Sequence, residues 1–142
     1  YTLKNHVEMV LDLSSTLPNT NASPQQLGHV FMNLITNAVE AMAGTLKSDS
    51  ASQTATTADR RIAIRSGLKD DTITVEVKDT GPGISEEDLE HIFDFFYTRK
   101  KEKGMGIGLS ICHGIIEDHD GSIMAANAPE GGAVFTVTLP VT

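Results

Sequence analysis

The segment from Ser23 to Met42 pairs a complete apolar helical face with a polar stripe beside it. Ser23-Pro24 is a good helix start, because a capping hydroxyl precedes a proline at the first helical position. The residues that recur at helical spacing are apolar: Leu27, Val30, Phe31, Leu34, Ala38, Ala41 and Met42. At about 100° per residue, a neighbouring stripe collects polar side chains: Gln26, His29, Asn33, Asn37 and Glu40. A stripe at the edge of a core can line a cleft while its helix stays packed.

The rest of the chain alternates between strand-like and helix-like patterns. Five β-branched or alternating runs predict strands at 6–13, 61–66, 72–79, 122–127 and 133–139. Two further helices are predicted, one opened by Ser85 and ending near Phe93, and one over 107–119. We expect 44–59 and 98–106 to be flexible loops, 67–71 to join a hairpin, and 128–132 to be a turn. This order predicts one mixed sheet with helices on one face.

Composition limits the classes of partner. The chain has 142 residues, which is the size of one domain. Its net charge of −8 disfavours nucleic acid and direct membrane contact, because both need a basic face. The single cysteine, Cys112, excludes an internal disulfide and fits a reducing, cytoplasmic location. Nothing in the chain reads as a signal peptide or a membrane helix, although a parent protein could still be membrane-anchored.

Three polar motifs follow one another in a suggestive order. Asn33 and Asn37 lie one helical turn apart, and amide oxygens suit a hard cation such as Mg²⁺ that shares phosphate oxygens. Asp79 ends a strand before Gly81-Pro82-Gly83, where a carboxylate can accept a hydrogen bond from adenine's exocyclic amine. A late glycine loop then opens a helix, whose free N–H groups favour phosphate. Each motif alone is weak, and together they predict a purine-nucleotide site.

The set resembles the N, G1, F and G2 boxes of the ATP-binding catalytic domain of bacterial sensor histidine kinases, over residues 17–140. The nitrogen-regulatory and oxygen-sensing subgroup, with its NAxEAM helix, is the most similar. The resemblance implies a Bergerat fold: an α+β two-layer sandwich in which three helices cover one face of a mixed, mostly antiparallel sheet of about five strands. It also implies that residues 1–142 form a single ATP-binding domain, with ATP and Mg²⁺ as its ligands.

The resemblance assigns roles residue by residue. It implies that Asn37 ligates Mg²⁺, that Asn33 supports the metal and phosphates in catalysis, and that Asp79 reads the adenine amine. Gly81 and Gly83 lie beneath the base. The implied phosphate loop consists of Gly104, Met105, Gly106, Ile107, Gly108 and Leu109.

An aromatic and basic segment corresponds to the lid of the family. Phe96 and Tyr97, together with Phe93, match the F box that anchors the lid, although Phe93 can equally be a core aromatic. Arg99, Lys100, Lys101 and Lys103 follow, and we hypothesise that Lys100 or Arg99 reaches the γ-phosphate. The alternative is a solvated run of charge. Two departures from the family stand out, because Phe95 replaces a proline and Glu40 stands where many members have lysine.

The expected reaction is phosphoryl transfer to histidine. Hydrolases of this fold place a glutamate where Asn33 stands, and an amide cannot act as a general base. None of His6, His29, His91, His113 and His119 lies in a phosphoacceptor motif, so we expect the acceptor on a dimerisation domain that precedes Tyr1 and is absent here. That helical domain is the predicted partner, together with a response regulator bound through the full-length kinase. We expect the isolated chain to be a monomer that binds Mg-ATP with little autophosphorylation. A hydrolytic ATPase module and a non-catalytic nucleotide-binding or protein-interaction module remain the alternatives.

Overall fold

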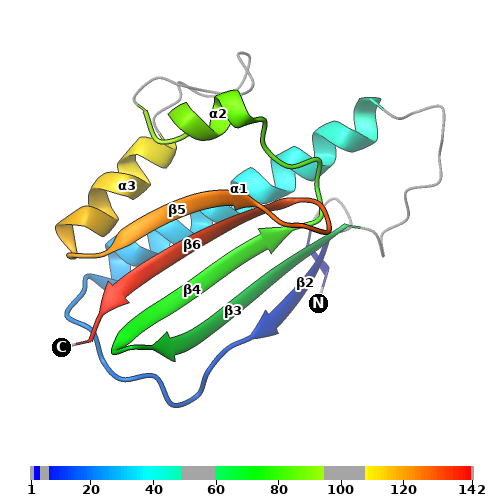
Figure 1. The fold of residues 1–142 in the computed structure, drawn as a ribbon. Coiled ribbons are helices and arrows are strands. Elements are labelled where there is room, and N and C mark those ends of the chain that lie inside the picture. Colours follow the sequence, from blue (N-terminus) through cyan, green and yellow to red (C-terminus); the bar gives the residue numbers. More distant parts are fainter. Residues whose placement is uncertain (1, 4–6, 49–59, 95–107, 142) are drawn as a thin grey trace.

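The fold is a single sheet covered by helices on one face (Figure 1). The computed structural model describes residues 2–3, 7–48, 60–94 and 108–141, with side chains from residue 7 onward except 43–48. The strand order is β1-β2-β3-β4-β6-β5. The strands are β1 (Thr2–Leu3), β2 (Val7–Asp12), β3 (Arg61–Lys69), β4 (Thr72–Asp79), β5 (Ser122–Asn127) and β6 (Ala133–Pro140). Only the β2–β3 pair is parallel among the described strands, so the predicted mixed, mostly antiparallel sheet is confirmed.

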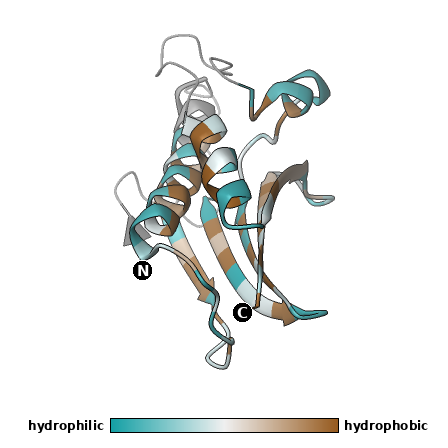
Figure 2. Cartoon of the chain, turned by 90° about the vertical axis from the view of Figure 1, so that its left-hand side faces the viewer, coloured by the Kyte–Doolittle hydropathy of each residue, from teal (hydrophilic) through white to brown (hydrophobic). Residues whose placement is uncertain are grey.

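The three predicted helices are present: α1 (Pro24–Ser48), α2 (Glu86–His91) and α3 (Gly108–Asp118). Helices α1 and α3 form the second layer. Figure 2 shows the helical layer beside the edge-on sheet. The alternation along β6 explains the packing, because its odd-numbered residues are buried toward the helices and its even-numbered residues are partly exposed on the other face.

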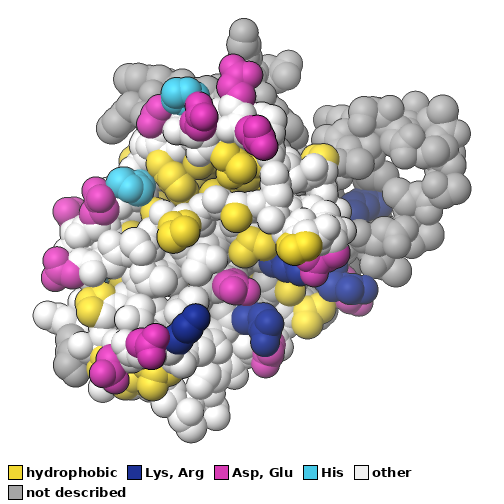
Figure 3. All heavy atoms as spheres, in the orientation of Figure 1, with side chains coloured by type: hydrophobic (Ala, Val, Ile, Leu, Met, Phe, Trp, Pro, Cys, Tyr) yellow, Lys and Arg dark blue, Asp and Glu magenta, His cyan; other side chains and the backbone are white. Residues whose placement is uncertain are grey.

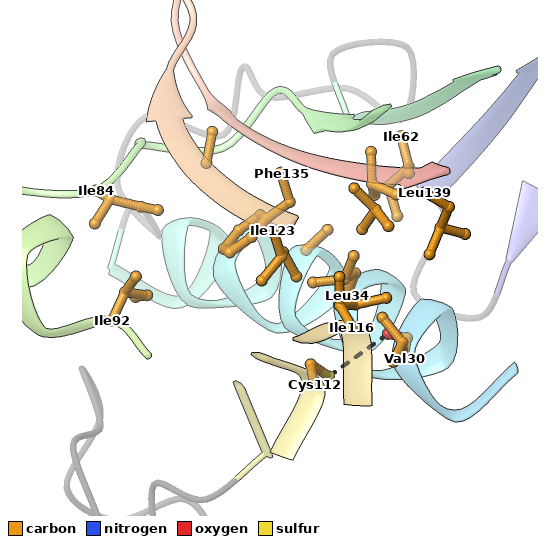
Figure 4. Close-up of a cluster of buried hydrophobic side chains, with 14 of the residues drawn as sticks. Val30, Leu34, Ile62, Ile84, Ile92, Cys112, Ile116, Ile123, Phe135 and Leu139 are labelled. Atoms are coloured by element: carbon orange, nitrogen blue, oxygen red, sulfur yellow. Dashed lines mark hydrogen bonds between the residues drawn. The ribbon is translucent and has the colours of Figure 1, made fainter. Parts of the chain in front are cut away.

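The core lies where α1 and α3 meet the sheet (Figure 4). Val30 and Leu34 of α1 and Cys112 and Ile116 of α3 are fully buried. The Cys112 thiol donates to the Val30 carbonyl oxygen at 3.8 Å, so the helices touch through a polar contact as well as through apolar packing. Burial is the main reason that the pKa of the Cys112 thiol rises to about 11.

His119 joins the C-terminal end of α3 to the N-terminal end of α1. The His119 Nδ1 lies 2.7 Å from the Ile115 carbonyl oxygen, and its Nε2 accepts the Ser23 N–H at 3.1 Å. The neutral ring with its proton on Nδ1 satisfies both bonds. Through these two bonds, one neutral side chain therefore links the end of α3 to the start of α1.

Several predicted boundaries were wrong. The β3–β4 connection is a two-residue turn, because β3 continues to Lys69 and only Asp70 and Asp71 lie between the strands, both with positive φ. Such a turn matches the twist of the paired strands, and Asp tolerates the left-handed region better than most residues. Helix α1 continues beyond Met42 to Ser48, which removes the first residues of the predicted 44–59 loop. A two-residue strand, β1, joins the five predicted strands.

The face of the sheet opposite the helices carries paired charges. Arg61 of β3 contacts Glu8 of β2 at 3.1 Å, and Lys78 of β4 contacts Glu130. Figure 3 views this face, where basic side chains lie beside acidic ones. Within the described ranges, no helix has the length and apolar character that crossing a membrane requires.

Candidate functional site

A buried carboxylate at the end of β4 is the centre of the candidate site. Asp79 is only 5% exposed, and it is the one charged or polar residue among the buried set of the described chain. Its Oδ1 accepts the Gly81 N–H at 2.8 Å and the Ala133 N–H at 3.1 Å. Its Oδ2 accepts no hydrogen bond from the described residues. One oxygen is therefore fixed by the protein, and the other remains an acceptor for a ligand.

The turn after Asp79 packs against the second half of α1. A Cβ placed on Gly81 would lie 3.3 Å from Met42 Cγ and 3.2 Å from Asp79 Oδ1. Thr80 adds two contacts, because its Oγ1 accepts the Arg61 N–H at 2.9 Å and lies 3.5 Å from Met42 Sδ. The absence of a side chain at Gly81 lets the helix come this close, which explains why this position is glycine.

Asn127, which no sequence motif marks as a site residue, holds the far end of the turn. Gly83 has a φ of 85°, in the region that favours glycine. A Cβ at this position would lie 2.9 Å from Asn127 Oδ1. The Asn127 side chain accepts the Ile84 N–H at 2.7 Å and donates to the Ile84 carbonyl oxygen at 2.6 Å.

Gly132, a second residue that no sequence motif marks, packs against the backbone of Asp79. Gly132 lies in the β5–β6 turn with a φ of 86°. A Cβ there would lie 2.0 Å from the Asp79 carbonyl oxygen, a separation that atoms cannot adopt. The β5–β6 turn therefore approaches the end of β4 so closely that only glycine fits.

Asn33 lies in the middle of the predicted stripe, beside the start of α3. A Cβ on Gly108 would lie 3.4 Å from Asn33 Oδ1, and Asn33 Nδ2 donates to the His29 carbonyl oxygen at 3.2 Å. A hydrogen bond with Asn33 also lowers the pKa of the Cys112 thiol, against the larger effect of burial. The structure thus brings together Asn33 and Gly108, two of the predicted site residues from segments far apart in sequence.

Asn37 lies between the two ends of the site. It is half-buried on α1, one turn after Asn33, and its side chain forms no hydrogen bond within the described part of the chain. From Asn33 beside α3 to Ala41 beside Gly81 is eight residues, or about 12 Å along the helix axis. The described residues contain no cluster of three or more His, Cys, Asp or Glu side chains arranged to hold a metal ion.

The remaining predicted site residues divide into two groups. Leu109 is half-buried against the core at the start of α3. Phe93 packs on His113 at 5.5 Å and edge-on to Phe135 at 6.3 Å between ring centres, so it links the end of α2 to α3 and β6. The others lie outside the described residues: Phe96, Tyr97, Arg99, Lys100, Gly104, Met105, Gly106 and Ile107.

A cavity of about 400 Å³ lies on the open face of the sheet. It is lined by Arg61, Ala63, Lys78, Thr80, Gly81, Glu130 and Gly131. A hydrogen bond from Lys78 lowers the pKa of Glu130, so this wall of the cavity is an ion pair. The cavity adjoins the turn after Asp79 from the side opposite to α1.

Comparison with known proteins identifies the fold and the relatives. The family described as histidine kinase-, DNA gyrase B-, and HSP90-like ATPase matches residues 22–142. The sensor histidine kinase TmoS of Ectopseudomonas mendocina is 39% identical over 96% of this chain and 13% of its own length. The C4-dicarboxylate transport sensor protein DctS of Rhodobacter capsulatus is 39% identical over 97% of this chain and 19% of its own length. The chain therefore spans less than a fifth of either relative.

Solved structures agree with these relatives. A nucleotide-free form of the catalytic domain of histidine kinase ThkA superposes with a TM-score of 0.76 at 31% identity, covering 96% of this chain and 80% of that one. The resemblance to histidine kinase catalytic domains that the sequence suggested is confirmed, and so is the fold class.

Two adjacent glycines test the approach of the β5–β6 turn to Asp79. Both have positive φ, but a Cβ on Gly131 meets no atom within 4 Å, whereas one on Gly132 collides with the Asp79 carbonyl. We expect Gly131→Ala to lower the free energy of unfolding by about 1 kcal/mol through backbone strain alone. Gly132→Ala should cost about 3 kcal/mol or more, since strain and overpacking add. Urea unfolding measures both, and equal losses would contradict the close approach.

Proposed function

Since the chain belongs to the histidine kinase-, DNA gyrase B-, and HSP90-like ATPase family, we propose that it binds Mg-ATP and transfers the γ-phosphate to a histidine on a separate domain. The transfer would serve two-component signalling, as the names of its relatives suggest. The fragment is then the ATP-binding catalytic domain of a longer sensor histidine kinase.

The observation that carries the proposal is the hydrogen bonding of the Asp79 carboxylate, in which only one oxygen accepts bonds from the described residues. Its Oδ1 is committed to two backbone N–H groups, which fixes the plane of the carboxylate. Its Oδ2 accepts nothing from the described residues, although the side chain is buried. A ligand that brings a donor would be favoured here, because a hydrogen bond to a charged group contributes about 1.5–3 kcal/mol. The exocyclic amine of adenine is such a donor.

The position of α1 supports a ligand that extends from Asp79 toward α3. The base would lie over Gly81, next to the second half of α1. The phosphates would lie near Asn33 and Gly108, where the first N–H groups of α3 lack partners within the helix. The sugar and phosphates would cover the length of α1 between these points, and Asn37 lies on this path.

Asn37 and Asn33 are the residues that we assign to the metal and phosphate region. The Asn37 amide has no partner in the described chain, so its oxygen is available to a hard cation. Mg²⁺ would neutralise phosphate charge during transfer. Asn33 lies against Gly108 and donates to the His29 carbonyl oxygen, which orients its own oxygen toward the start of α3.

The basic segment supplies the remaining charge in this proposal. Arg99, Lys100, Lys101 and Lys103 are four of the eleven Lys and Arg residues of the chain. Because the protein has a net charge of −8, a polyanion needs local cations. We assign γ-phosphate contact to Lys100 or Arg99, with the lid anchored by Phe96 and Tyr97.

Transfer to histidine is favoured over hydrolysis. Asn33 occupies the position where a hydrolase would need a carboxylate base, and an amide cannot take a proton from water. An imidazole is a stronger nucleophile than water, so phosphoryl transfer to it needs mainly positioning and charge neutralisation. We propose that the imidazole belongs to a helical dimerisation and phosphoacceptor domain, that a response regulator is the final acceptor, and that the reaction takes place in the cytoplasm.

Calorimetric titration of ATP, with and without Mg²⁺, tests the two ends of the site. We expect Asp79→Asn to weaken ATP about 10- to 100-fold, because a hydrogen bond to a charged group contributes about 1.5–3 kcal/mol. Asn37→Asp should weaken ATP without Mg²⁺ and increase the stimulation by Mg²⁺, since a carboxylate repels phosphates unless a cation lies between them.

The matched control for the added charge is Asn21→Asp. Asn21 is exposed before α1, close in sequence to the Ser23–His119 contact and so at the end of α3 away from Gly108. The Mg²⁺ dependence of this control should equal that of wild type. If Asn21→Asp and Asn37→Asp behave alike, the metal assignment is wrong.

Phosphotransfer tests the reaction itself. With ATP labelled on the γ-phosphate, the isolated chain should label itself only weakly and should label the helical phosphoacceptor domain of its parent kinase when that domain is added. Lys100→Ala should slow this transfer about 100-fold, the typical effect of removing one group that stabilises transition-state charge. Lys69→Ala, on an exposed strand end, should not slow it. Rapid release of free phosphate by wild type, with no labelled protein, would instead identify a hydrolase.

A further inference from the structure

We propose that Asn127 is a positioning residue, which holds the Gly81–Ile84 backbone in the shape that seats the adenine base. The geometry alone supports the claim that Asn127 holds this turn. The effect on adenine binding rests on the proposed function. Asn127 is the last residue of β5 and is separated from Ile84 by 43 positions in sequence.

Two short hydrogen bonds join Asn127 to a single residue of the turn. Its Oδ1 accepts the Ile84 N–H at 2.7 Å, and its Nδ2 donates to the Ile84 carbonyl oxygen at 2.6 Å. The side-chain amide thus copies the pairing that a neighbouring strand would offer to a backbone residue. Only a side chain with both a donor and an acceptor can satisfy both groups, and asparagine has them at this length.

Contact with Gly83 shows that the fit extends beyond Ile84. A Cβ on Gly83 would lie 2.9 Å from Asn127 Oδ1, so the backbone of Gly83 passes directly beside the amide. Gly83 also has the positive φ that turns the chain at this point. Asn127 therefore borders the one residue of the turn whose conformation most depends on having no side chain.

The same hairpin reaches both ends of the turn. Asn127 pairs with Ala133 across β5 and β6, and the Ala133 N–H donates to Asp79 Oδ1 at 3.1 Å. The connection between them is closed by the Ala128 N–H bond to the Gly132 carbonyl oxygen at 2.9 Å. One rigid hairpin thus orients the Asp79 carboxylate at the start of the turn and Ile84 at its end. The distance between these two contacts sets the shape of the backbone between them.

This role differs from general stabilisation of the fold. Asn127 is exposed as a residue, so truncating it removes little apolar packing. Its two hydrogen bonds join the hairpin to the backbone of Ile84, whose side chain is buried in the core, and neither bond involves α1 or α3. Removing the amide should loosen the turn while leaving the phosphate end of the site, around Asn33 and Gly108, unchanged.

The first test needs no nucleotide. Amide hydrogen exchange followed by NMR should show the Ile84 N–H exchanging about fivefold faster or more in Asn127→Ala, because the hydrogen bond that protects it is lost. Asn127→Asp keeps the acceptor for the Ile84 N–H but places a carboxylate against the Ile84 carbonyl oxygen, and it should also speed exchange. Asn21→Ala is the matched control and should leave Ile84 unchanged. Unaltered exchange at Ile84 in both Asn127 variants would overturn the proposal.

The second test separates positioning of the base from loss of structure. In Asn127→Ala, ATP should bind about tenfold more weakly, whereas inorganic tripolyphosphate, which has no base, should keep its wild-type affinity. If both ligands weaken in parallel, Asn127 acts on the whole fold and the positioning role is wrong. If wild type binds no ATP, the proposed function fails, and the exchange experiment still decides whether Asn127 holds the turn. Should Asn127→Ala not fold, Asn127→Asp carries the same comparison.

Discussion

The hydrogen bonding of one carboxylate oxygen organises the candidate site. Asp79 Oδ1 accepts N–H groups from Gly81, two residues later, and from Ala133, 54 residues later. Because these donors come from a turn and from a separate strand, the carboxylate can be satisfied only when β4, β6 and the turn are all in place. A buried carboxylate without such partners would be costly, so this arrangement couples the formation of the sheet to the geometry of the site. The second oxygen is left to meet a ligand.

The two-layer architecture explains why the site lies at one edge of the core. The helices need one face of the sheet for apolar burial, and α1 gives its fully apolar side to that purpose. Its polar stripe then lies along the boundary of the core, between the turn after Asp79 and the start of α3. Glycines mark both approaches: Gly81 where the turn meets Met42, and Gly108 where α3 meets Asn33. The helix thus packs through one side, and in the proposed function it binds through another.

Much of this could be predicted from the sequence, because the signals are local. The apolar periodicity of α1, the β-branched strands and the motif at Asp79 each lie within a single short segment. What could not be predicted depends on contacts across the chain. Asn127 and Gly132 look like ordinary strand-end and turn residues, and their importance appears only when Ile84 and Asp79 are brought beside them. The pair Gly131-Gly132 does indicate a turn with positive φ or a close approach by another part of the chain. It does not reveal that the approaching backbone is that of Asp79.

The most direct measurement compares ATP with its analogue lacking the exocyclic amine, purine riboside triphosphate, in wild type and in Asp79→Asn. If Asp79 Oδ2 accepts the adenine amine, losing the amine should weaken binding to wild type about tenfold or more, since a hydrogen bond to a charged group contributes about 1.5–3 kcal/mol. The same loss should have almost no further effect in Asp79→Asn, so the two changes should be strongly non-additive. If the amine matters equally in both proteins, Asp79 does not read the base, and the site as we describe it is wrong.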